Sequence, residues 1–405
     1  MKDIANGTIQ RFLIRTAVAC AVLVAAASLT RSDAQTYTVL YNFDGTNEGS
    51  PGSAGVSLDA AGNLYGATSA GGSSSLGIVF KLDTAGNATV LHSFTGYPLD
   101  GARPSGVILD PSGNLYGMTR QAGTNGNGVA YKLSASGKMT VLHGFTGGTD
   151  GGQPWAGLIR DPSGNLYGTT YVGGGGGGGG SGDCAISGCG AVFKLSPGGK
   201  VTTLHGFSAN ASDGRNPTGG LLRDAAGNLY GTTWGGGAYG GGTVFKLDIC
   251  GRETILHSFS GCSGIGGPDG CNPNGDLAQD IAGNLFGTTY SGGSFGYGVV
   301  FKLDASGYET VLHSFAADPD GAYPEAGLVR DAAGNLYGTT YGGGSFYGTV
   351  FKIDPTGAET VLHAFSYADG AQPHATLLLF GNSLYGTANG GGTNAGVIFK
   401  IALGP

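Results

Sequence analysis

The chain has 405 residues, of which 84 are glycine, about three times the usual share of ~7%. Hydrophobic residues make up 40% of the chain, which is too many for a disordered protein, and glycine does not recur at every third position as collagen requires. Glycine costs ~1 kcal/mol at an interior helical position relative to alanine, so the composition favours an all-β protein with many tight turns. The net charge of −7 disfavours nucleic-acid binding.

Residues 1–34 have the pattern of a secretory signal peptide. Three cations precede a mostly apolar run from Thr16 to Thr30, and a small-x-small cleavage site follows at Ser32 to Ala34. The apolar run is shorter than the ~20 residues of a transmembrane helix, and no later segment of the sequence predicts a membrane span. We therefore expect residues 35–405 to form a single secreted domain, periplasmic or extracellular, with a net charge of −9 after the loss of four cations and two anions.

Three short motifs each recur seven times along the rest of the chain. They are Gly-Asn-Leu-Tyr-Gly, Val-Phe-Lys-Leu and Thr-Val-Leu-His-x-Phe, with small variations, and Asp-Gly follows the third motif. Self-similarity at a period near 50 residues is typical of one supersecondary unit repeated in space. The leucines that mark the first motif are Leu64, Leu115, Leu166, Leu229, Leu285, Leu336 and Leu384.

Each unit contains four short strand signals separated by turn residues. In the third unit, runs at 157–160, 166–170, 191–195 and 201–207 predict four antiparallel strands, with an Asp-Pro-Ser-Gly-Asn turn at 161–165. Glycines in the second strand would let neighbouring four-stranded units approach closely. Seven such units predict an all-β fold, a seven-bladed β-propeller with four antiparallel strands in each blade.

The two ends of the repeat region predict how the ring closes. Residues 38–43 have the fourth-strand motif without the three strands that should precede it, and the last unit stops after its third strand at 397–401. We predict that the N-terminal strand joins the last blade, because this pairing removes the exposed edge of an incomplete sheet.

Export permits disulfide bonds. Cys184 and Cys189 flank one short loop, and Cys262 and Cys271 flank another, so we pair them in this way and leave Cys250 unpaired. A bridge between Cys250 and Cys262 is the alternative that the sequence leaves open. Because both loops are small, we expect the bridges to shape the loops rather than to hold the fold together.

The repeated units resemble a known family. Gly-Asn-Leu-Tyr-Gly-Thr-Thr, Gly-Thr-Val-Phe-Lys-Leu and Thr-Val-Leu-His-Ser-Phe are similar to the GloVer tandem repeat of bacterial secreted proteins, in which varied C-terminal anchors follow the repeats. The resemblance covers residues 36–403 and implies a β-propeller-like, secreted protein, but no reaction and no defined ligand. The chain ends shortly after its last strand motif, so we expect no anchor of that kind.

Two enlarged loops break the symmetry of the repeats. One runs from Tyr171 to Cys189 and contains eight consecutive glycines at 173–180, and the other follows Phe259. In a propeller both would lie on the same face, and binding usually resides in loops that vary on a rigid scaffold. The glycine run itself predicts a flexible spacer, because the Gly-Lys-Ser/Thr and the helix of a phosphate loop do not follow it.

Histidines and aspartates form two series that repeat with the blades. The histidines of the third motif lie on the outermost strand, too far apart to share an ion, and we interpret them as hydrogen-bonding groups between blades. The Asp-Gly aspartates either accept backbone N–H bonds in Asx-type turns or bind a cationic ligand, although no dense Asp-x-Asp-x-Asp spacing supports calcium. The aspartates that we consider as ligand-binding candidates are Asp150, Asp213, Asp269, Asp320 and Asp369.

A second set of candidates lies just before the first strand of each unit, which is the strand nearest the propeller axis. The residue type at this position differs from blade to blade, and we expect these residues around the mouth of the central channel. A carboxylate beside an imidazole in adjacent blades could perform acid–base chemistry, and a tryptophan could stack on a sugar. No Ser/His/Asp order, zinc spacing or cofactor fingerprint accompanies them, so we expect no cofactor and leave metal binding open. These candidates are Trp155, Thr218, Asn274, Glu325 and His374.

The sequence thus favours a secreted, monomeric, non-catalytic propeller that binds an extracellular polymer or an envelope protein through its loop-rich face, and no nucleic acid. Two alternatives stay open. One is a lyase- or lactonase-like enzyme that uses Glu325 and His374 at the channel mouth. The other is a purely structural surface protein without a discrete ligand.

Overall fold

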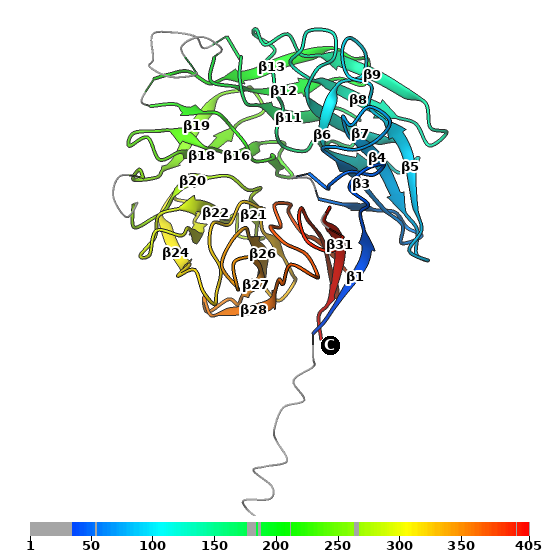
Figure 1. Cartoon of the computed structure of the whole chain (residues 1–405). Helices are drawn as coiled ribbons and strands as arrows, with labels where there is room; N and C mark the ends of the chain where they lie inside the picture. The colour runs from blue at the N-terminus through cyan, green and yellow to red at the C-terminus, as the bar shows by residue number, and fades with distance from the viewer. Residues whose placement is uncertain are drawn as a thin grey trace, which may run out of the picture.

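The computed structural model arranges the chain around a central axis (Figure 1). The expected signal peptide, residues 1–34, lies outside the described residues, and so does most of the glycine run, from 176 to 180. Among the described residues, no helix has both the length and the apolar character to cross a membrane. The structure describes residues 35–52, 55–175, 184, 188–210, 212–262, 267–393 and 395–404.

Seven antiparallel sheets form the blades, which confirms the seven-bladed propeller. The first blade consists of β2 (Ser57–Leu58), β3 (Leu64–Thr68), β4 (Ile78–Leu82) and β5 (Ala88–Ser93). The second blade consists of β6 (Ala102–Leu109), β7 (Leu115–Gln121), β8 (Val129–Leu133) and β9 (Met139–Gly144). The third blade consists of β10 (Ile159–Arg160), β11 (Leu166–Thr170), β12 (Ala191–Leu195) and β13 (Val201–Gly206). The strands expected in the third unit are therefore present within one or two residues.

The next three blades repeat the pattern with small additions. The fourth blade consists of β15 (Leu222–Arg223), β16 (Leu229–Thr233), β18 (Thr243–Leu247) and β19 (Glu253–Ser258). The fifth consists of β20 (Cys271–Pro273), β21 (Ala278–Gln279), β22 (Leu285–Ser291), β23 (Val299–Leu303) and β24 (Glu309–Ser314). The sixth consists of β25 (Val329–Arg330), β26 (Leu336–Thr340), β27 (Thr349–Ile353) and β28 (Glu359–Ala364). In the fifth blade β20 and β21 both pair with β22, and a two-stranded ladder of β14 (Gly214–Arg215) and β17 (Gly235–Gly236) extends the fourth.

The seventh blade closes the ring as the sequence predicts. It consists of β29 (Leu378–Phe380), β30 (Ser383–Ala388), β31 (Val397–Ala402) and the N-terminal β1 (Thr36–Asn42). Strand β1 pairs antiparallel with β31, from Thr36 opposite Ala402 to Asn42 opposite Val397, and Figure 1 shows the two terminal strands side by side. The Tyr37 hydroxyl donates to the Asp369 carbonyl at 2.6 Å, and the Tyr37 ring stacks on His363.

An aromatic pair fills each interface between blades. The phenylalanine that follows a fourth strand packs edge-to-face on a third-strand ring of the next blade, with ring centroids 5.1–5.3 Å apart. Such pairs contribute ~0.5–1.5 kcal/mol each beyond the burial of their area. The pairs are Phe43–Phe80, Phe94–Tyr131, Phe145–Phe193, Phe207–Phe245, Phe259–Phe301, Phe315–Phe351 and Phe365–Phe399.

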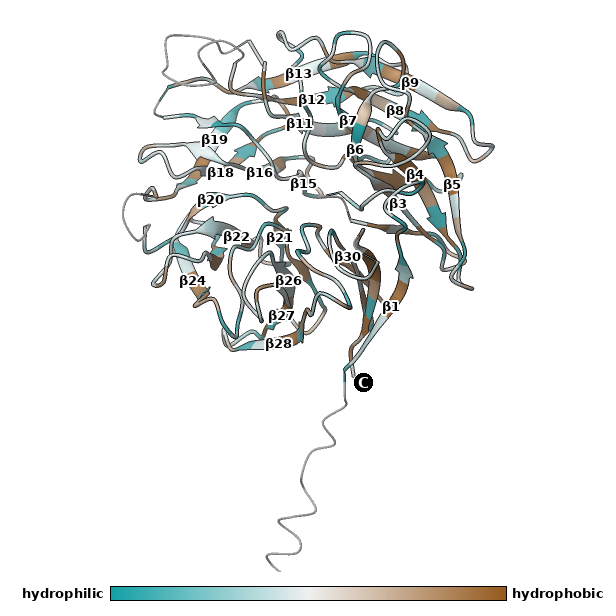
Figure 2. Cartoon of the chain, in the orientation of Figure 1, coloured by the Kyte–Doolittle hydropathy of each residue, from teal (hydrophilic) through white to brown (hydrophobic). Residues whose placement is uncertain are grey.

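The glycine of each Leu-Tyr-Gly motif makes room for the third-strand ring. Gly231 pairs with Phe245 in the ladder between β16 and β18, and a Cβ atom at Gly231 would lie 2.6 Å from the Phe245 ring. Real Cβ atoms do not approach rings so closely, so only glycine fits here. Figure 2 shows the apolar segments along the strands, while most loops are pale or hydrophilic.

A β-bulge in each fourth strand orients the repeated histidine. Between β12 and β13, Val192 pairs with His205 and Phe193 pairs with Thr203, so Leu204 is an extra residue. The other six pairs of third and fourth strands shift register at the same place. A bulge bends the strand and re-aims its side chains.

Replacing Tyr37 by alanine should weaken the closure of the ring. The variant loses the hydrogen bond to Asp369 and the stacking on His363, while β1 keeps its backbone pairing. We expect the free energy of unfolding, measured by denaturant titration with far-UV circular dichroism, to fall by about 2–4 kcal/mol. Tyr97→Ala removes an exposed side chain between blades and should change stability by less than ~0.5 kcal/mol. Equal losses in the two variants would contradict the closing role of Tyr37.

Candidate functional site

A pocket of about 830 Å³ lies on the propeller axis, and all seven blades contribute to its lining. One ring of lining residues directly follows a proline near the start of each blade, just before the inner strand or, in the second blade, inside β6. The five channel-mouth candidates from the sequence belong to this ring, and the structure therefore brings them together in one pocket. The ring consists of Gly52, Ser105, Trp155, Thr218, Asn274, Glu325 and His374.

A strained backbone position holds this ring in place. In six blades the residue before the proline has a left-handed backbone, with φ between 53° and 58°. The Gln153 N–H donates to the Asn127 carbonyl of the preceding blade at 2.8 Å, and the Gln153 carbonyl accepts from the Tyr171 N–H at 3.2 Å. Such conformations cost ~1–3 kcal/mol for non-glycine residues and persist where the surroundings hold them. The six residues are Arg103, Gln153, Asn216, Asn272, Tyr323 and Gln372.

A second ring, which sequence reasoning missed, follows the Gly-Thr-Thr of the second strands. The Trp155 and Tyr171 rings lie 5.4 Å apart, and the Trp234 and Tyr290 rings lie 5.5 Å apart. Both tryptophans of the chain therefore line this pocket. The signal in the sequence was an aromatic residue at this position in four blades. The ring consists of Ser69, Arg120, Tyr171, Trp234, Tyr290 and Asn389 in the lining, with Tyr341 against His374.

Arg120 gives one wall of the pocket a positive charge. Its guanidinium carbon lies 4.2 Å from the centre of the Trp155 ring, which is a cation–π contact. Burial lowers the pKa of Arg120 to about 10, and the nearby charge of Arg103 acts in the same direction. The guanidinium therefore remains charged at neutral pH, beside an aromatic surface.

Glu325 and His374 form a hydrogen-bonded pair across the boundary between the sixth and seventh blades. His374 Nδ1 lies 2.5 Å from Glu325 Oε2, and each side chain is about one-fifth exposed, at 20% for His374 and 22% for Glu325. Tyr341 packs against the imidazole with ring centroids 4.9 Å apart. If Nδ1 carries the proton donated to the carboxylate, Nε2 is the basic nitrogen. This pair has the chemistry of an acid–base catalyst.

Asp276 of the fifth blade and Thr376 of the seventh form a hydrogen bond past the sixth blade, and sequence reasoning missed both. Thr376 Oγ1 donates to Asp276 Oδ2 at 3.0 Å, and the Gly220 N–H donates to Asp276 Oδ1 at 2.6 Å. The Gly327 N–H in turn donates to Thr376 Oγ1 at 3.1 Å. Asp276 and Thr376 lie just before the inner strand, at a position where the other blades have glycine, for example Gly157. The sequence signal for both residues was therefore this replacement of the repeated glycine. These bonds tie four blades together at the pocket.

Six of the seven Asp-Gly aspartates lie against the repeated histidines, and none of the seven is among the residues that line the pocket. His143 Nε2 lies 2.8 Å from Asp150 Oδ2, for example, and Thr146 donates its N–H to the same carboxylate. The histidines therefore hydrogen-bond or pair with aspartates in the connections to the next blades. The pairs are His92–Asp100, His143–Asp150, His205–Asp213, His257–Asp269, His313–Asp320 and His363–Asp369.

Glutamates begin three of the fourth strands and face these pairs. Glu309 lies near His257 and Asp269, and burial raises the pKa of Glu309 to about 7, with His257 opposing the shift and Asp269 adding to it. Burial raises the pKa of Glu359 to about 7 as well, and the charge of Asp320 adds to this shift. Both groups therefore titrate near neutrality in the folded protein.

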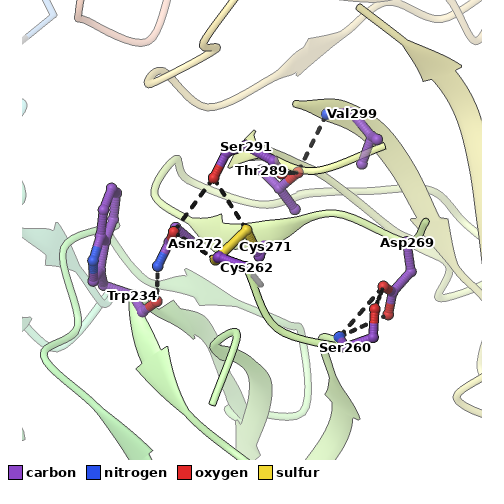
Figure 3. The surroundings of a disulfide bond; sticks show 9 residues. All are labelled: Trp234, Ser260, Cys262, Asp269, Cys271, Asn272, Thr289, Ser291 and Val299. Carbon is purple, nitrogen blue, oxygen red and sulfur yellow. Dashed lines mark hydrogen bonds between the residues drawn. A yellow bond between two sulfur atoms is a disulfide. The ribbon is translucent and has the colours of Figure 1, made fainter. Parts of the chain in front are cut away.

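The structure confirms the two expected disulfide bonds, Cys184–Cys189 and Cys262–Cys271, and leaves Cys250 free and exposed. Cys271 directly precedes Asn272, one of the left-handed residues. The Asn272 side-chain amide donates to the Trp234 carbonyl at 2.8 Å (Figure 3). The second bridge thus fastens the segment that holds Trp234 at the pocket.

The chain belongs to the family of the Gloeobacter/Verrucomicrobia repeat, whose model matches residues 27–181 and 181–399. Among curated proteins, none is similar in sequence. The extracellular domain of a putative one component system from B. thetaiotaomicron is 13% identical, with a TM-score of 0.56 over 93% of this chain and 42% of that one.

Two further solved structures have the same fold. Puromycin hydrolase is 15% identical, with a TM-score of 0.56 over 89% of this chain and 54% of that one. A putative 6-phosphogluconolactonase from Bacteroides uniformis is 14% identical, with a TM-score of 0.50 over 80% of this chain and 89% of that one. The chain spans less than half of the extracellular domain of the one component system and about half of puromycin hydrolase. At these identities the likeness shows the fold alone.

Replacing Glu309 and Glu359 together by glutamine should stabilise the propeller most at alkaline pH. A glutamate with a folded pKa of about 7 and an unfolded pKa of ~4.3 favours unfolding increasingly as pH rises from about 4.5 to 7. Glutamine removes this penalty, so the Tm difference between variant and wild type should grow from pH 5 to pH 8 in calorimetry. Asp318→Asn, at an exposed carboxylate, should show no such growth. A difference independent of pH would contradict the assignment.

Proposed function

We propose that this member of the repeat family is a binding module that holds an extracellular carbohydrate polymer in the pocket on its axis. In this proposal residues 1–34 are removed on export, and residues 35–405 act as a single monomeric domain outside the cytoplasm. The two disulfide bonds support an oxidising location. The observation that carries the proposal is the gathering of both tryptophans of the chain in one pocket.

The lining suits a ligand with apolar faces and polar edges, as a sugar ring has. Trp155 is 40% exposed, which leaves part of its indole open to a ligand. Aromatic side chains combine a large apolar surface with low conformational entropy, and ligand pockets typically combine them with a few fixed polar groups. Asn274 and Thr218 supply neutral polar groups, and Arg120 supplies a cation.

Exposed aromatic side chains beyond the pocket favour a polymer over a single sugar. Tyr239, Phe295 and Phe346 are 69%, 56% and 88% exposed. They lie in the loops that continue from Trp234, Tyr290 and Tyr341, on the face where the pocket opens. A chain of sugars bound in the pocket would extend over these loops.

A hydrolytic or eliminative enzyme is the second candidate, because Glu325 and His374 form a hydrogen-bonded pair in the pocket. Glu325 would orient the imidazole, and His374 would move a proton to or from the bound substrate. Puromycin hydrolase and a putative lactonase have the same fold, but at 15% and 14% identity this likeness carries no activity.

A glycan array with residues 35–405, followed by fluorescence titration of any ligand found, tests the binding proposal. Because both tryptophans line the pocket, binding should change the intrinsic fluorescence. Trp155→Ala should weaken binding about tenfold or more, which corresponds to a loss of ~1.4 kcal/mol. Tyr308→Ala, at an exposed tyrosine in a turn between third and fourth strands on the opposite face, is the matched control. No glycan bound, or unchanged binding by Trp155→Ala, would refute the proposal.

The same ligand separates binding from catalysis. In a binding module, Glu325→Gln and His374→Ala change affinity only modestly, and the ligand is recovered intact by mass spectrometry. In an enzyme, wild type converts the ligand, and each of the two variants lowers the rate by about 10²–10⁴-fold while still binding it. Turnover that disappears in both variants would overturn the non-catalytic reading.

A further inference from the structure

The interface between the third and fourth blades departs from the other blade interfaces. His205 Nε2 lies 3.5 Å from Asp213 Oδ1 and 3.5 Å from Glu253 Oε2. Among the described residues, no other trio of His, Cys, Asp or Glu ligand atoms converges within 4.8 Å. We infer that these three side chains form a divalent-cation site whose geometry suits Zn²⁺, separate from the pocket on the axis.

The distances fit shared coordination better than hydrogen bonding. Four of the other five histidines hydrogen-bond to their aspartates at 2.7–3.1 Å, and His363 Nε2 lies 3.2 Å from Asp369 without a hydrogen bond. Zinc binds imidazole nitrogen and carboxylate oxygen at ~2.0–2.2 Å in tetrahedral geometry, which puts two ligand atoms about 3.3–3.5 Å apart. The spacing around His205 Nε2 matches this value for both carboxylates. His205 is thus placed as a ligand beside two others, rather than as a donor to one.

Each side chain of the cluster has a buried polar atom without a hydrogen-bond partner. Asp213 Oδ2 accepts the N–H and the hydroxyl of Ser208, both at 2.8 Å. This fixes the carboxylate, as second-shell hydrogen bonds do at metal sites, and leaves Asp213 Oδ1 directed at His205. His205 Nε2 and Asp213 Oδ1 are buried without a hydrogen-bond partner, and so is Glu253 Oε1, the second oxygen of the carboxylate whose Oε2 lies near His205. Single atoms of this kind also occur at His363 and Glu309, so the convergence of three ligand groups is what distinguishes this cluster. Unsatisfied buried polar atoms are costly, and a cation among them would satisfy them together.

The charges of the three groups support the same conclusion. Two carboxyl groups lie beside one imidazole, so a dication bound among them would be attracted by both carboxylates. The side chains of His205, Asp213 and Glu253 are 19%, 13% and 14% exposed, so the cluster lies close to the surface. Three protein ligands with water in the fourth position form a common zinc arrangement. The ion would join the outer strands of two blades, β13 and β19.

The neighbouring interface supplies a matched control inside the same chain. There His257 lies 3.1 Å from Asp269, and Glu309 occupies the position that Glu253 has in the preceding copy. The residue types are identical, but their ligand atoms do not converge. A site that depends on geometry should therefore be lost when Glu253 is changed and kept when Glu309 is changed.

The experiment measures zinc binding to residues 35–405 without a polyhistidine tag, after treatment with EDTA and buffer exchange. All proteins carry Cys250→Ser, so that the free thiol cannot bind the ion. Calorimetric titration with ZnCl₂ should show one equivalent bound by wild type and by Glu309→Gln. Glu253→Gln and His205→Ala should bind about 100-fold more weakly or not at all. Cobalt(II) in place of zinc should give the visible absorption bands of a tetrahedral site in the first two proteins only.

Stability measurements keep the test independent of folding failures. Circular dichroism in EDTA shows whether each variant is folded. If His205→Ala does not fold, the near-isosteric Glu253→Gln is the variant that decides the test. Zinc should raise the Tm of wild type and of Glu309→Gln but not that of Glu253→Gln. The inference is overturned if wild type binds no stoichiometric zinc, or if Glu253→Gln binds as tightly as wild type. Binding of Mn²⁺ in preference to Zn²⁺ would refute the choice of ion.

Discussion

The propeller depends on a three-part contact that recurs at every blade interface. A glycine in the second strand leaves space for the aromatic ring of the third strand, and the phenylalanine after the preceding blade's fourth strand packs against that ring. Between the third and fourth blades these parts are Gly231, Phe245 and Phe207. A Cβ atom on the glycine would displace the ring, and the ring carries the contact between blades. The glycine at this position of the second strand and the packing between blades are therefore fixed by the same steric requirement.

Because the strands carry this constraint, the positions beside the axis can differ from blade to blade. The residue after the inner-strand proline is tryptophan in the third blade, glutamate in the sixth and histidine in the seventh. The left-handed residue before the proline is bonded to two neighbouring loops, so it holds the backbone whatever side chain follows. Binding loops on rigid scaffolds work in this way. The fold provides seven fixed positions, and the sequence of each blade decides their chemistry.

The fold was predictable because its determinants are local and repeated. Strand and turn signals lie within one unit, and seven copies remove the ambiguity of any one of them. The closing strand was predictable from the incomplete units at the two ends of the repeats. The role of the second-strand glycine was only partly predictable: Gly231 makes room for Phe245 of its own blade, and the close contact between blades follows from that ring. The β-bulge at Leu204 was not predictable either, because no local residue marks it.

Contacts across the axis and between blades were the least accessible to sequence reasoning. Asp276 and Thr376 are separated by 100 residues and meet only because successive blades curve around the axis. His205 and Glu253 likewise belong to different blades, and the sequence shows the same residue types at His257 and Glu309, where the ligand atoms do not converge. Repetition thus predicts what the copies share. Function depends on small departures between copies, and their geometry appears only when adjacent blades are placed against each other.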